Sequence, residues 1–328
     1  MEGKALYSRI RSTGSALPAR SVTNDELAAE LALRGIETSD AWIRPRTGIC
    51  RRHIASESET TLTLAADASR RALEAGGVAP SEIGLVIVAT TTPDQVFPAV
   101  ACRLQAALGI PPCASFDLQA VCSGFAYALS VADSMIRAGA AKKALVVGAD
   151  TLSRLIDWND RATCVLFGDG AGAAVLEASD EPGILASELV ADGSKAEILN
   201  APGRIEGGKL LGSGFLYMEG RAVFKEAVHS LESTARSVLG KAGLSAAGLA
   251  WYIPHQANIR IMSAVAGRLG IPEERMVATV SEHGNTCAAS VPLALDAAVR
   301  GGKIRRGDAI LLQGVGAGMT CGSVLARF

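Results

Sequence analysis

Three segments of the chain are apolar at nearly every position. They are residues 84–90 (GLVIVAT), 144–149 (ALVVGA) and 309–315 (AILLQGV). Strands that are covered by helices on both faces have this composition, because neither face of the sheet meets water. Segments in which apolar residues recur at helical spacing lie between the three strands. The pattern predicts an α/β protein.

A fourth extended segment, from Ala114 to Cys122, leads directly into a helix. From Ser123 onward the apolar residues fall roughly at helical spacing. Cys122 would then lie beside the unpaired N–H groups of the first turn, which together with the helix dipole favour the reactive thiolate. This position makes Cys122 a candidate nucleophile. The simpler alternative is a buried structural cysteine.

The same order of signals occurs twice along the chain. Each copy contains an apolar strand, a Leu-Gly-Ile-Pro motif, a further segment, a helix that ends near an arginine, and another apolar strand. The two copies occupy residues 84–149 and 248–315. We predict an internal duplication and two similar halves, divided near the polar turn 179–183 into residues 1–178 and 179–328.

The duplication predicts which polar residues meet. If the two helix ends are matched, Asn285 is the counterpart of Cys122, and if the two first strands are matched, His255 follows the first strand of the second half. Open α/β sheets bind ligands at the carboxyl ends of their strands. We therefore expect Cys122, His255 and Asn285 to share one site. The alternatives are a His255 satisfied in the core and an Asn285 that only caps a turn or helix.

These three residue types together suit acyl chemistry. A thiolate beside an imidazole can attack a thioester or amide carbonyl and form an acyl-enzyme. Asn285 does not titrate, but its amide can donate a hydrogen bond to a developing oxyanion, as can a neutral His255. Two donors on one oxygen would stabilise an enolate.

Two other kinds of residue compete for attention near the site. His283 lies two residues before Asn285 and is interpreted as a turn residue. The glycine clusters at 168–172 and 314–318 lack the G-x-G-x-x-G pattern of nucleotide binding. We interpret the clusters as tight turns that let the backbone approach the site.

Composition narrows the class of protein. The 328 residues exceed the size at which one hydrophobic core keeps growing, and the net charge of −1 gives no general attraction to nucleic acid or to an anionic membrane. With no signal peptide and no apolar run of about 18 residues, we expect a cytoplasmic protein. The seven cysteines lack C-x-x-C spacing, so we expect free thiols in a reducing compartment and no zinc site.

Taken together, the motifs resemble the thiolase-fold condensing enzymes and, within them, β-ketoacyl-[acyl-carrier-protein] synthase III. The resemblance covers essentially the whole chain and is carried by residues 42–49, 91–102, 119–125, 167–176, 254–260, 283–291 and the terminal glycine loop. It implies a five-layered αβαβα thiolase-like fold built from two similar halves, usually in a homodimer. It also implies an acyltransferase that starts fatty-acid synthesis by condensing an acyl-CoA primer, acetyl-CoA or another short one, with malonyl-[acyl-carrier-protein], releasing CoA and CO2.

The resemblance implies roles for the candidate residues. Cys122 would carry the acyl group, and the backbone N–H groups of Cys122 and Ala317 would form the oxyanion hole. His255 and Asn285 would stabilise the enolate left by decarboxylation. No metal or redox cofactor is implied, because decarboxylation itself supplies the carbanion.

The resemblance also implies binding residues for CoA. Trp42 and Arg161 are similar to the pair that sandwiches the adenine, and Arg46 to a contact with the phosphates. An aromatic face and guanidinium groups suit a flat base and phosphate anions. Each of the three could instead be a surface anchor or a salt-bridge residue.

Residues of a carrier-protein surface and of a dimer contact are implied as well. Lys225, Arg260 and Arg268 fall where the family presents a basic rim to an acidic carrier protein, with a solvated helix face as the alternative. Phe97 is similar to the residue that reaches across the dimer to close the partner's acyl pocket. Its alternative is core packing.

The chain departs from the family pattern at two places. Where three glycines are commonly followed by an aromatic residue, Thr, Trp and Gly, residues 316–322 read Gly-Ala-Gly-Met-Thr-Cys-Gly. The loss of two large rings changes the volume behind Cys122, which leaves the acyl primer open. Cys287 stands where serine is common and adds a thiol near the site.

Three other functions compete with the condensing enzyme. One is an acyltransferase or specialised-metabolite synthase of the same fold that uses another acyl primer or acceptor. A second is a papain-like protease, in which Cys, His and Asn also occur in that order. The third is a non-catalytic scaffold that keeps only the fold.

Overall fold

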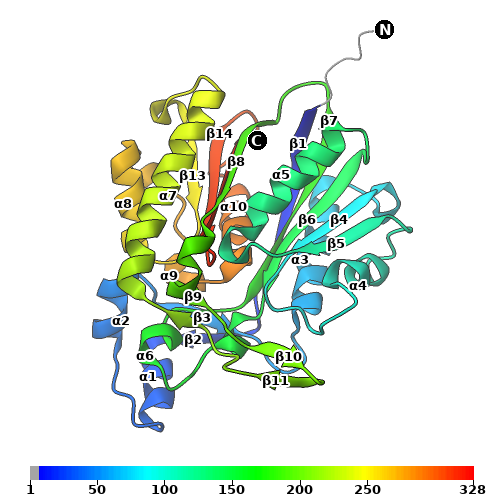
Figure 1. Ribbon diagram of the computed structural model, residues 1–328. Coiled ribbons are helices and arrows are strands. Elements are labelled where there is room, and N and C mark those ends of the chain that lie inside the picture. The colour runs from blue at the N-terminus through cyan, green and yellow to red at the C-terminus, as the bar shows by residue number, and fades with distance from the viewer. Residues whose placement is uncertain (1–6) are drawn as a thin grey trace.

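The computed structural model describes residues 7–328 and contains two mixed β-sheets (Figure 1). The strand order in the first sheet is β1 (Tyr7–Ala16), β7 (Gly170–Ser179), β6 (Lys143–Asp150), β4 (Leu85–Ala89) and β5 (Ala114–Leu118). The order in the second sheet is β13 (Trp251–Pro254), β14 (Ala309–Gly316), β15 (Thr320–Arg327) and β8 (Ile184–Ala191). The three fully apolar segments of the sequence form β4, β6 and β14, as predicted.

Helices form three layers around the two sheets. Between the sheets lie α5 (Gly124–Arg137) and α10 (Ser290–Arg300), which share one buried core with strands of both. The outer face of the first sheet is covered by α3 (Thr61–Gly76) and α4 (Val100–Ala107), and that of the second by α7 (Gly220–Lys241) and α8 (Ile259–Leu269). The predicted five-layered α/β fold is therefore confirmed.

Short elements gather at one end of the two sheets (Figure 1). Several of their residues, among them Leu199 and Met218, line a large cavity. These elements are α1 (Asn24–Ala32), α2 (Asp40–Thr47), α6 (Arg161–Cys164), α9 (Val280–His283), β2 (Arg20–Thr23), β3 (Arg51–Ile54), β9 (Leu199–Asn200), β10 (Arg204–Glu206), β11 (Lys209–Leu211) and β12 (Tyr217–Met218). Within residues 7–328, no helix has both the length and the apolar content needed to span a bilayer.

The sheet topology repeats, as the duplicated sequence signals predict. The order β8-β15-β14-β13 in the second sheet matches the order β1-β7-β6-β4 in the first. Only the counterpart of β5 is reduced, to an isolated parallel bridge between Tyr252 and Met276. The chain passes from the first sheet to the second between Ser179 and Ile184. The division into residues 1–178 and 179–328 stays a prediction.

Two short 3-10 turns occupy equivalent positions in the repeat. One spans Val121–Ser123 before α5, and the other spans Cys287–Ala289 before α10. The first residue of each has a positive φ, 48° at Val121 and 51° at Cys287, which is rare for residues other than glycine. When the two turns are aligned, the residue equivalent to Cys122 is Ala288 and not Asn285. Counting back from the helix ends gave the wrong counterpart, because α10 has 11 residues and α5 has 14.

Each turn packs against the sheet of the opposite half, at a glycine. A Cβ atom at Gly148 of β6 would lie 2.3 Å from the carbonyl oxygen of Ala288, and one at Gly314 of β14 would lie 2.6 Å from Cα of Ser123. The glycine cluster at 314–318 was expected to form a turn, but Gly314 and Gly316 belong to β14. Likewise, β7 already begins at Gly170. The glycines permit a close backbone approach, as expected, but from within strands.

We predict that Gly314→Ala destabilises the protein by about 1–3 kcal/mol, because the new methyl group overlaps backbone atoms of the turn that carries Cys122. Unfolding by urea, followed by circular dichroism, measures the change. The control is Gly267→Ala in α8, where a Cβ meets nothing within 4 Å. That variant should gain up to about 1 kcal/mol. Equal stability of the two variants would contradict the close packing.

Candidate active site

One cavity of about 600 Å³ brings Cys122, His255 and Asn285 together. The three residues are buried, at 4% to 6% exposed, and they come from a turn of the first half and two segments of the second. Most of the remaining wall is apolar, with Leu155 and Leu216 among its residues. Within residues 7–328, no cluster of three or more His, Cys, Asp or Glu side chains is arranged to hold a metal ion.

Cys122 is activated by its neighbours. Its Sγ lies 3.4 Å from Sγ of Cys287. The pKa of Cys122 falls to about 6, chiefly because Cys287 donates a hydrogen bond to the thiolate; burial opposes this, and His255 adds to it. From the sequence, the low pKa of Cys122 was expected to come from the start of a helix. Cys122 instead lies in a 3-10 turn, and α5 begins only at Gly124. The thiolate is the form that attacks carbonyl carbon.

His255 is fixed at the end of β13. Its N–H donates to the carbonyl of Gln313 at 2.7 Å, and its Nδ1 contacts the hydroxyl of Ser290 at the start of α10. The Ser290 oxygen accepts a hydrogen bond from the N–H of Gln256, which leaves its own proton for Nδ1. When Nδ1 accepts from this hydroxyl, Nε2 is the ring nitrogen that carries a proton and can donate.

Asn285 is held through both its backbone and its side chain. Its N–H donates to the carbonyl of Leu166 at 2.9 Å, and its carbonyl accepts from the N–H of Gly168 at 2.9 Å. The side-chain Oδ1 accepts a hydrogen bond from the N–H of Cys287 at 3.0 Å. With the oxygen engaged in this way, the amide N–H groups remain as donors.

His283, interpreted as a turn residue, ends the short helix α9 just before Gly284.

The sequence reading missed Asp150, a buried carboxylate at the end of β6. Its Oδ1 accepts hydrogen bonds from the N–H of Thr91 at 2.8 Å and from the hydroxyls of Thr90 and Thr92. Its Oδ2 accepts from the N–H of Ala288 at 3.0 Å. Burial raises the pKa of Asp150, although the hydrogen bonds oppose it. A carboxylate directly after an apolar strand was the available signal.

The terminal glycine loop forms part of the cavity wall. Both Ala317 and Met319 line the cavity, whereas Cys321 lies buried beside α7 with its Sγ 3.3 Å from Oγ1 of Thr234. Of the two positions where the family commonly has a ring, therefore, only Met319 borders the cavity. The backbone N–H of Ala317 stays a predicted oxyanion donor, together with that of Cys122.

The three residues expected to bind CoA lie together outside the cavity lining. The guanidinium of Arg161 lies 4.5 Å from the centre of the Trp42 ring, and that of Arg46 lies 4.8 Å from it. Arg161 also donates to the carbonyl of Glu37 at 2.9 Å. These are cation–π contacts, and a spacing of 4.5 Å leaves no room for a base between Trp42 and Arg161.

The three basic residues of the predicted carrier-protein surface differ in their surroundings. Lys225 and Arg260 are exposed, and their sequence neighbours Phe224 and Ile261 line the cavity. Arg268 forms an ion pair with Glu232, with an N–O distance of 3.1 Å. Two of the three positive charges thus flank the cavity lining, and the third is partly neutralised.

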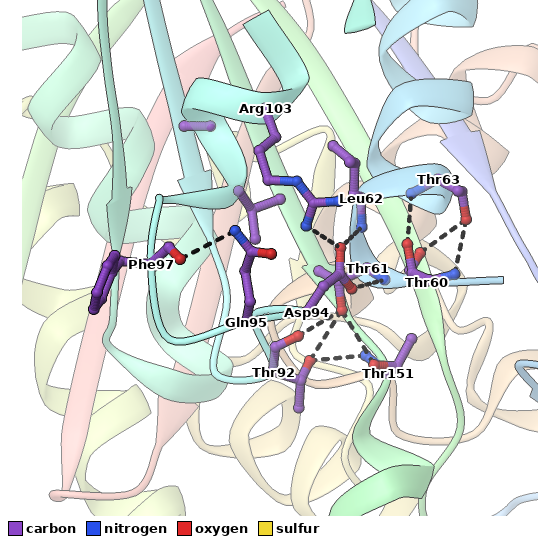
Figure 2. Close-up of polar contacts among 12 residues, drawn as sticks. Thr60, Thr61, Leu62, Thr63, Thr92, Asp94, Gln95, Phe97, Arg103 and Thr151 are labelled. Atoms are coloured by element: carbon purple, nitrogen blue, oxygen red, sulfur yellow. Dashed lines mark hydrogen bonds and ion pairs between the residues drawn. The ribbon is translucent and has the colours of Figure 1, made fainter. Parts of the chain in front are cut away.

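Phe97 lies at the tip of a loop whose base is anchored. Asp94 accepts hydrogen bonds from the N–H groups of Thr61 and Leu62 at the start of α3 and pairs with Arg103 at 3.4 Å (Figure 2). Phe97 points away from this cluster (Figure 2) and is 81% exposed. Core packing, the alternative for Phe97, is therefore wrong.

Comparison with known proteins places this site in a family. The sequence profile described as 3-oxoacyl-[acyl-carrier-protein (ACP)] synthase III matches residues 116–193, and the profile of its C-terminal part matches residues 239–328. Here 3-oxoacyl is synonymous with β-ketoacyl.

Solved structures agree over nearly the whole chain. The 3-oxoacyl-[acyl-carrier-protein] synthase III of Aquifex aeolicus is 45% identical with a TM-score of 0.91, covering 98% of this chain and 100% of that one. The enzyme of Pseudomonas aeruginosa is 42% identical with a TM-score of 0.91 and 98% of each chain covered. A priming β-ketosynthase of the R1128 polyketide pathway is 38% identical with a TM-score of 0.92, covering 98% of this chain and 96% of that one.

We predict that Asp150→Asn lowers the free energy of unfolding by about 1–3 kcal/mol. The amide must turn its NH2 group toward either the threonine donors or the N–H of Ala288, which leaves a buried donor without an acceptor. Urea unfolding measures the loss. The control, Asp67→Asn on the exposed surface of α3, should change stability by less than about 0.5 kcal/mol. An unchanged midpoint for Asp150→Asn would show that the carboxylate is dispensable.

We also predict that alkylation of Cys122 by iodoacetamide follows a titration with a midpoint near pH 6, because the rate tracks the thiolate and the pKa is about 6. The rate is low below that pH and reaches a plateau above it. In Cys287→Ala the midpoint should move upward, because the donor to the thiolate is lost. Mass spectrometry of the peptide that contains Cys122 gives the rates. The same midpoint in both proteins would refute the role of Cys287.

Proposed function

Because this chain belongs to the 3-oxoacyl-[acyl-carrier-protein] synthase III family, we propose that it condenses an acyl-CoA primer with malonyl-[acyl-carrier-protein] through an acyl group on Cys122. The family makes it a condensing acyltransferase of fatty-acid biosynthesis and excludes the papain-like alternative. The observation that carries the residue assignment is one cavity lined by Cys122, His255 and Asn285, with a thiol pKa of about 6. A reactive thiol in such a cavity argues against a non-catalytic scaffold.

In the first half of the reaction, the Cys122 thiolate attacks the thioester carbonyl of acyl-CoA. A bond forms between the carbonyl carbon and Sγ, the bond to the CoA sulfur breaks, and CoA leaves as the thiol after taking a proton. The backbone N–H groups of Cys122 and Ala317 hold the oxyanion. In support, a Cβ at Gly316 would lie 2.6 Å from the backbone nitrogen of Cys122, so the terminal strand passes directly beside this group.

In the second half, the malonyl thioester loses CO2 and becomes an enolate. The Nε2–H of His255 and the amide of Asn285 donate to the enolate oxygen, which the contacts of Nδ1 and Oδ1 leave them free to do. The enolate carbon attacks the acyl carbonyl on Cys122. The new carbon–carbon bond forms as the thiolate leaves, and the 3-oxoacyl product departs on the carrier protein.

Trp42, Arg46 and Arg161 bind CoA outside the cavity in this proposal. Two cations already lie within 5 Å of the Trp42 ring centre, so the ring is a ready stacking surface for a base and the guanidinium groups are near enough to meet phosphates. Binding of the adenine between Trp42 and Arg161 requires Arg161 to move away from the ring.

The proposal includes two protein partners and a cytoplasmic location. Lys225 and Arg260 meet the acidic carrier protein where pantetheine enters the cavity, and Arg268 can join them only by leaving Glu232. Phe97 packs against a second copy of the chain in a homodimer. An anchored loop with an 81% exposed phenylalanine at its tip supports such a contact.

The primer distinguishes two versions of this function. A short primer such as acetyl-CoA would fit the housekeeping role, and another acyl chain would fit a specialised synthase. The likeness to a priming β-ketosynthase supports the second version, as does Met319 in the cavity wall, where the family commonly has an aromatic residue. Both versions load Cys122 first.

We predict that incubation with a suitable acyl-CoA adds one acyl mass to the peptide containing Cys122, and that Cys122→Ala prevents it. A series of acyl-CoA primers of increasing length and branching, followed by intact-protein mass, identifies the primer. His255→Ala and Asn285→Ala should still load the acyl group but should lose decarboxylation of the malonyl thioester by about a hundredfold or more. Released 14C-labelled CO2 measures the second step.

Two results would overturn this assignment. Acylation of another cysteine, or of none by any primer, would remove Cys122 from the mechanism. Lost loading with intact decarboxylation in the His255 and Asn285 variants would reverse the roles. The loading control is Cys102→Ser, an exposed position in α4 remote from the cavity lining.

A further inference from the structure

Two thiols from different halves of the chain meet at the active site. Sγ of Cys122 and Sγ of Cys287 are 3.4 Å apart, and a disulfide requires about 2.05 Å. Bond formation therefore requires the two sulfur atoms to approach each other by about 1.4 Å. Both cysteines are free thiols in this structure.

Only one of the two thiols faces the cavity. Cys122 lines the cavity wall, whereas Cys287 does not and has an exposed fraction of 0%. A small solute that enters through the cavity therefore reaches Cys122 first. Cys287 is shielded from the cavity, and its thiol is in contact with that of Cys122.

Cys287 is held in this position from both sides. Its own N–H donates to Oδ1 of Asn285, and the next N–H, of Ala288, donates to Asp150. Its φ of 51° is maintained by this pair of contacts. Besides Cys122, the thiol contacts the hydroxyl of Thr91 at 3.6 Å and interacts with the carboxylate of Asp150. The turn thus keeps the second sulfur against the first.

We propose that Cys122 and Cys287 form a reversible disulfide when the enzyme meets a hydroperoxide, and that this protects the nucleophile from irreversible oxidation. In the first step, the Cys122 thiolate attacks the O–O bond; an S–O bond forms, and the alcohol or water leaves after taking a proton. Sulfur loses two electrons and becomes the sulfenic acid. In the second step, Cys287 attacks that sulfur, the S–S bond forms, and the hydroxyl leaves as water with the Cys287 proton.

The disulfide switches off the proposed reaction. Its sulfur atoms have no thiolate to attack acyl-CoA, so loading stops until a dithiol reduces the bond by exchange. This consequence rests on the proposed function of Cys122, whereas formation of the disulfide does not. Without Cys287, the sulfenic acid is not captured as a disulfide and reacts with a second hydroperoxide molecule, which transfers one oxygen atom to the sulfur and leaves as alcohol or water. The product is the sulfinic acid, which dithiols do not reverse.

The test exposes the full-length protein to an excess of hydrogen peroxide, more than two equivalents, at neutral pH, blocks free thiols and maps peptides without reduction. The wild type should lose two hydrogen masses, show a cross-link between the peptides of Cys122 and Cys287, and regain full acyl loading with dithiothreitol. Cys287→Ser, with Cys287→Ala as a second variant, should instead gain two oxygen atoms on Cys122 and not regain loading. Cys102→Ser is the control and should behave as the wild type.

The outcomes separate this inference from the proposed function. A wild type that forms the sulfinic acid as fast as Cys287→Ser, or that cross-links a different pair, would overturn the redox pair. Acyl loading without any cross-link would do the same while leaving the proposed function intact. A cross-link in a protein that no acyl-CoA can load would support the redox pair and overturn the proposed function.

Discussion

Asp150 brings a carboxylate into the interior between the two halves, where hydrogen bonds from both halves hold it. Thr90, Thr91 and Thr92 at the end of β4 donate to one oxygen, and the N–H of Ala288 from the opposite half donates to the other. A buried charge is tolerated only where donors surround it, so this group fixes the positions of every segment that donates to it. Cys287 is one residue from Ala288. The surroundings of the Cys122 thiol therefore depend on this one carboxylate.

The halves are also locked together by mutual close packing. Gly148 in one sheet admits the turn of the second half, and Gly314 in the other sheet admits the turn of the first. Both contacts involve backbone atoms, which cannot adjust as a flexible side chain does. The thiol of Cys122, the imidazole of His255 and the amide of Asn285 keep their relative positions because the interface that carries them is rigid.

Much of this could be predicted from the sequence. Continuous apolar strands and a repeated order of signals were enough for an α/β fold with two similar halves, because helix-covered strands and duplicated halves both leave long-range patterns. The five layers were implied by the resemblance to the condensing enzymes. Local contacts left weaker traces. Matching the ends of α5 and α10 gave Asn285 as the counterpart of Cys122, which is wrong because α10 is shorter than α5. The role of Asp150 depends on hydrogen-bond donors that are far apart in sequence. The source of the low thiol pKa was assigned to a helix terminus, since nothing in the sequence places Cys287 within 3.4 Å.

The equivalent positive-φ turns at Val121 and Cys287 have a consequence for how such a chain can change. Duplication supplied the same backbone geometry twice, but a single cavity reaches only one of the two turns. The turn that carries Cys122 forms part of the cavity wall, so a substitution there changes the surface that a ligand in the cavity meets. The second turn, Cys287–Ala289, has the same backbone geometry but does not line the cavity. At this turn, a change of one side chain, that of Cys287, can alter the electrostatic environment of the Cys122 thiol without changing the cavity wall.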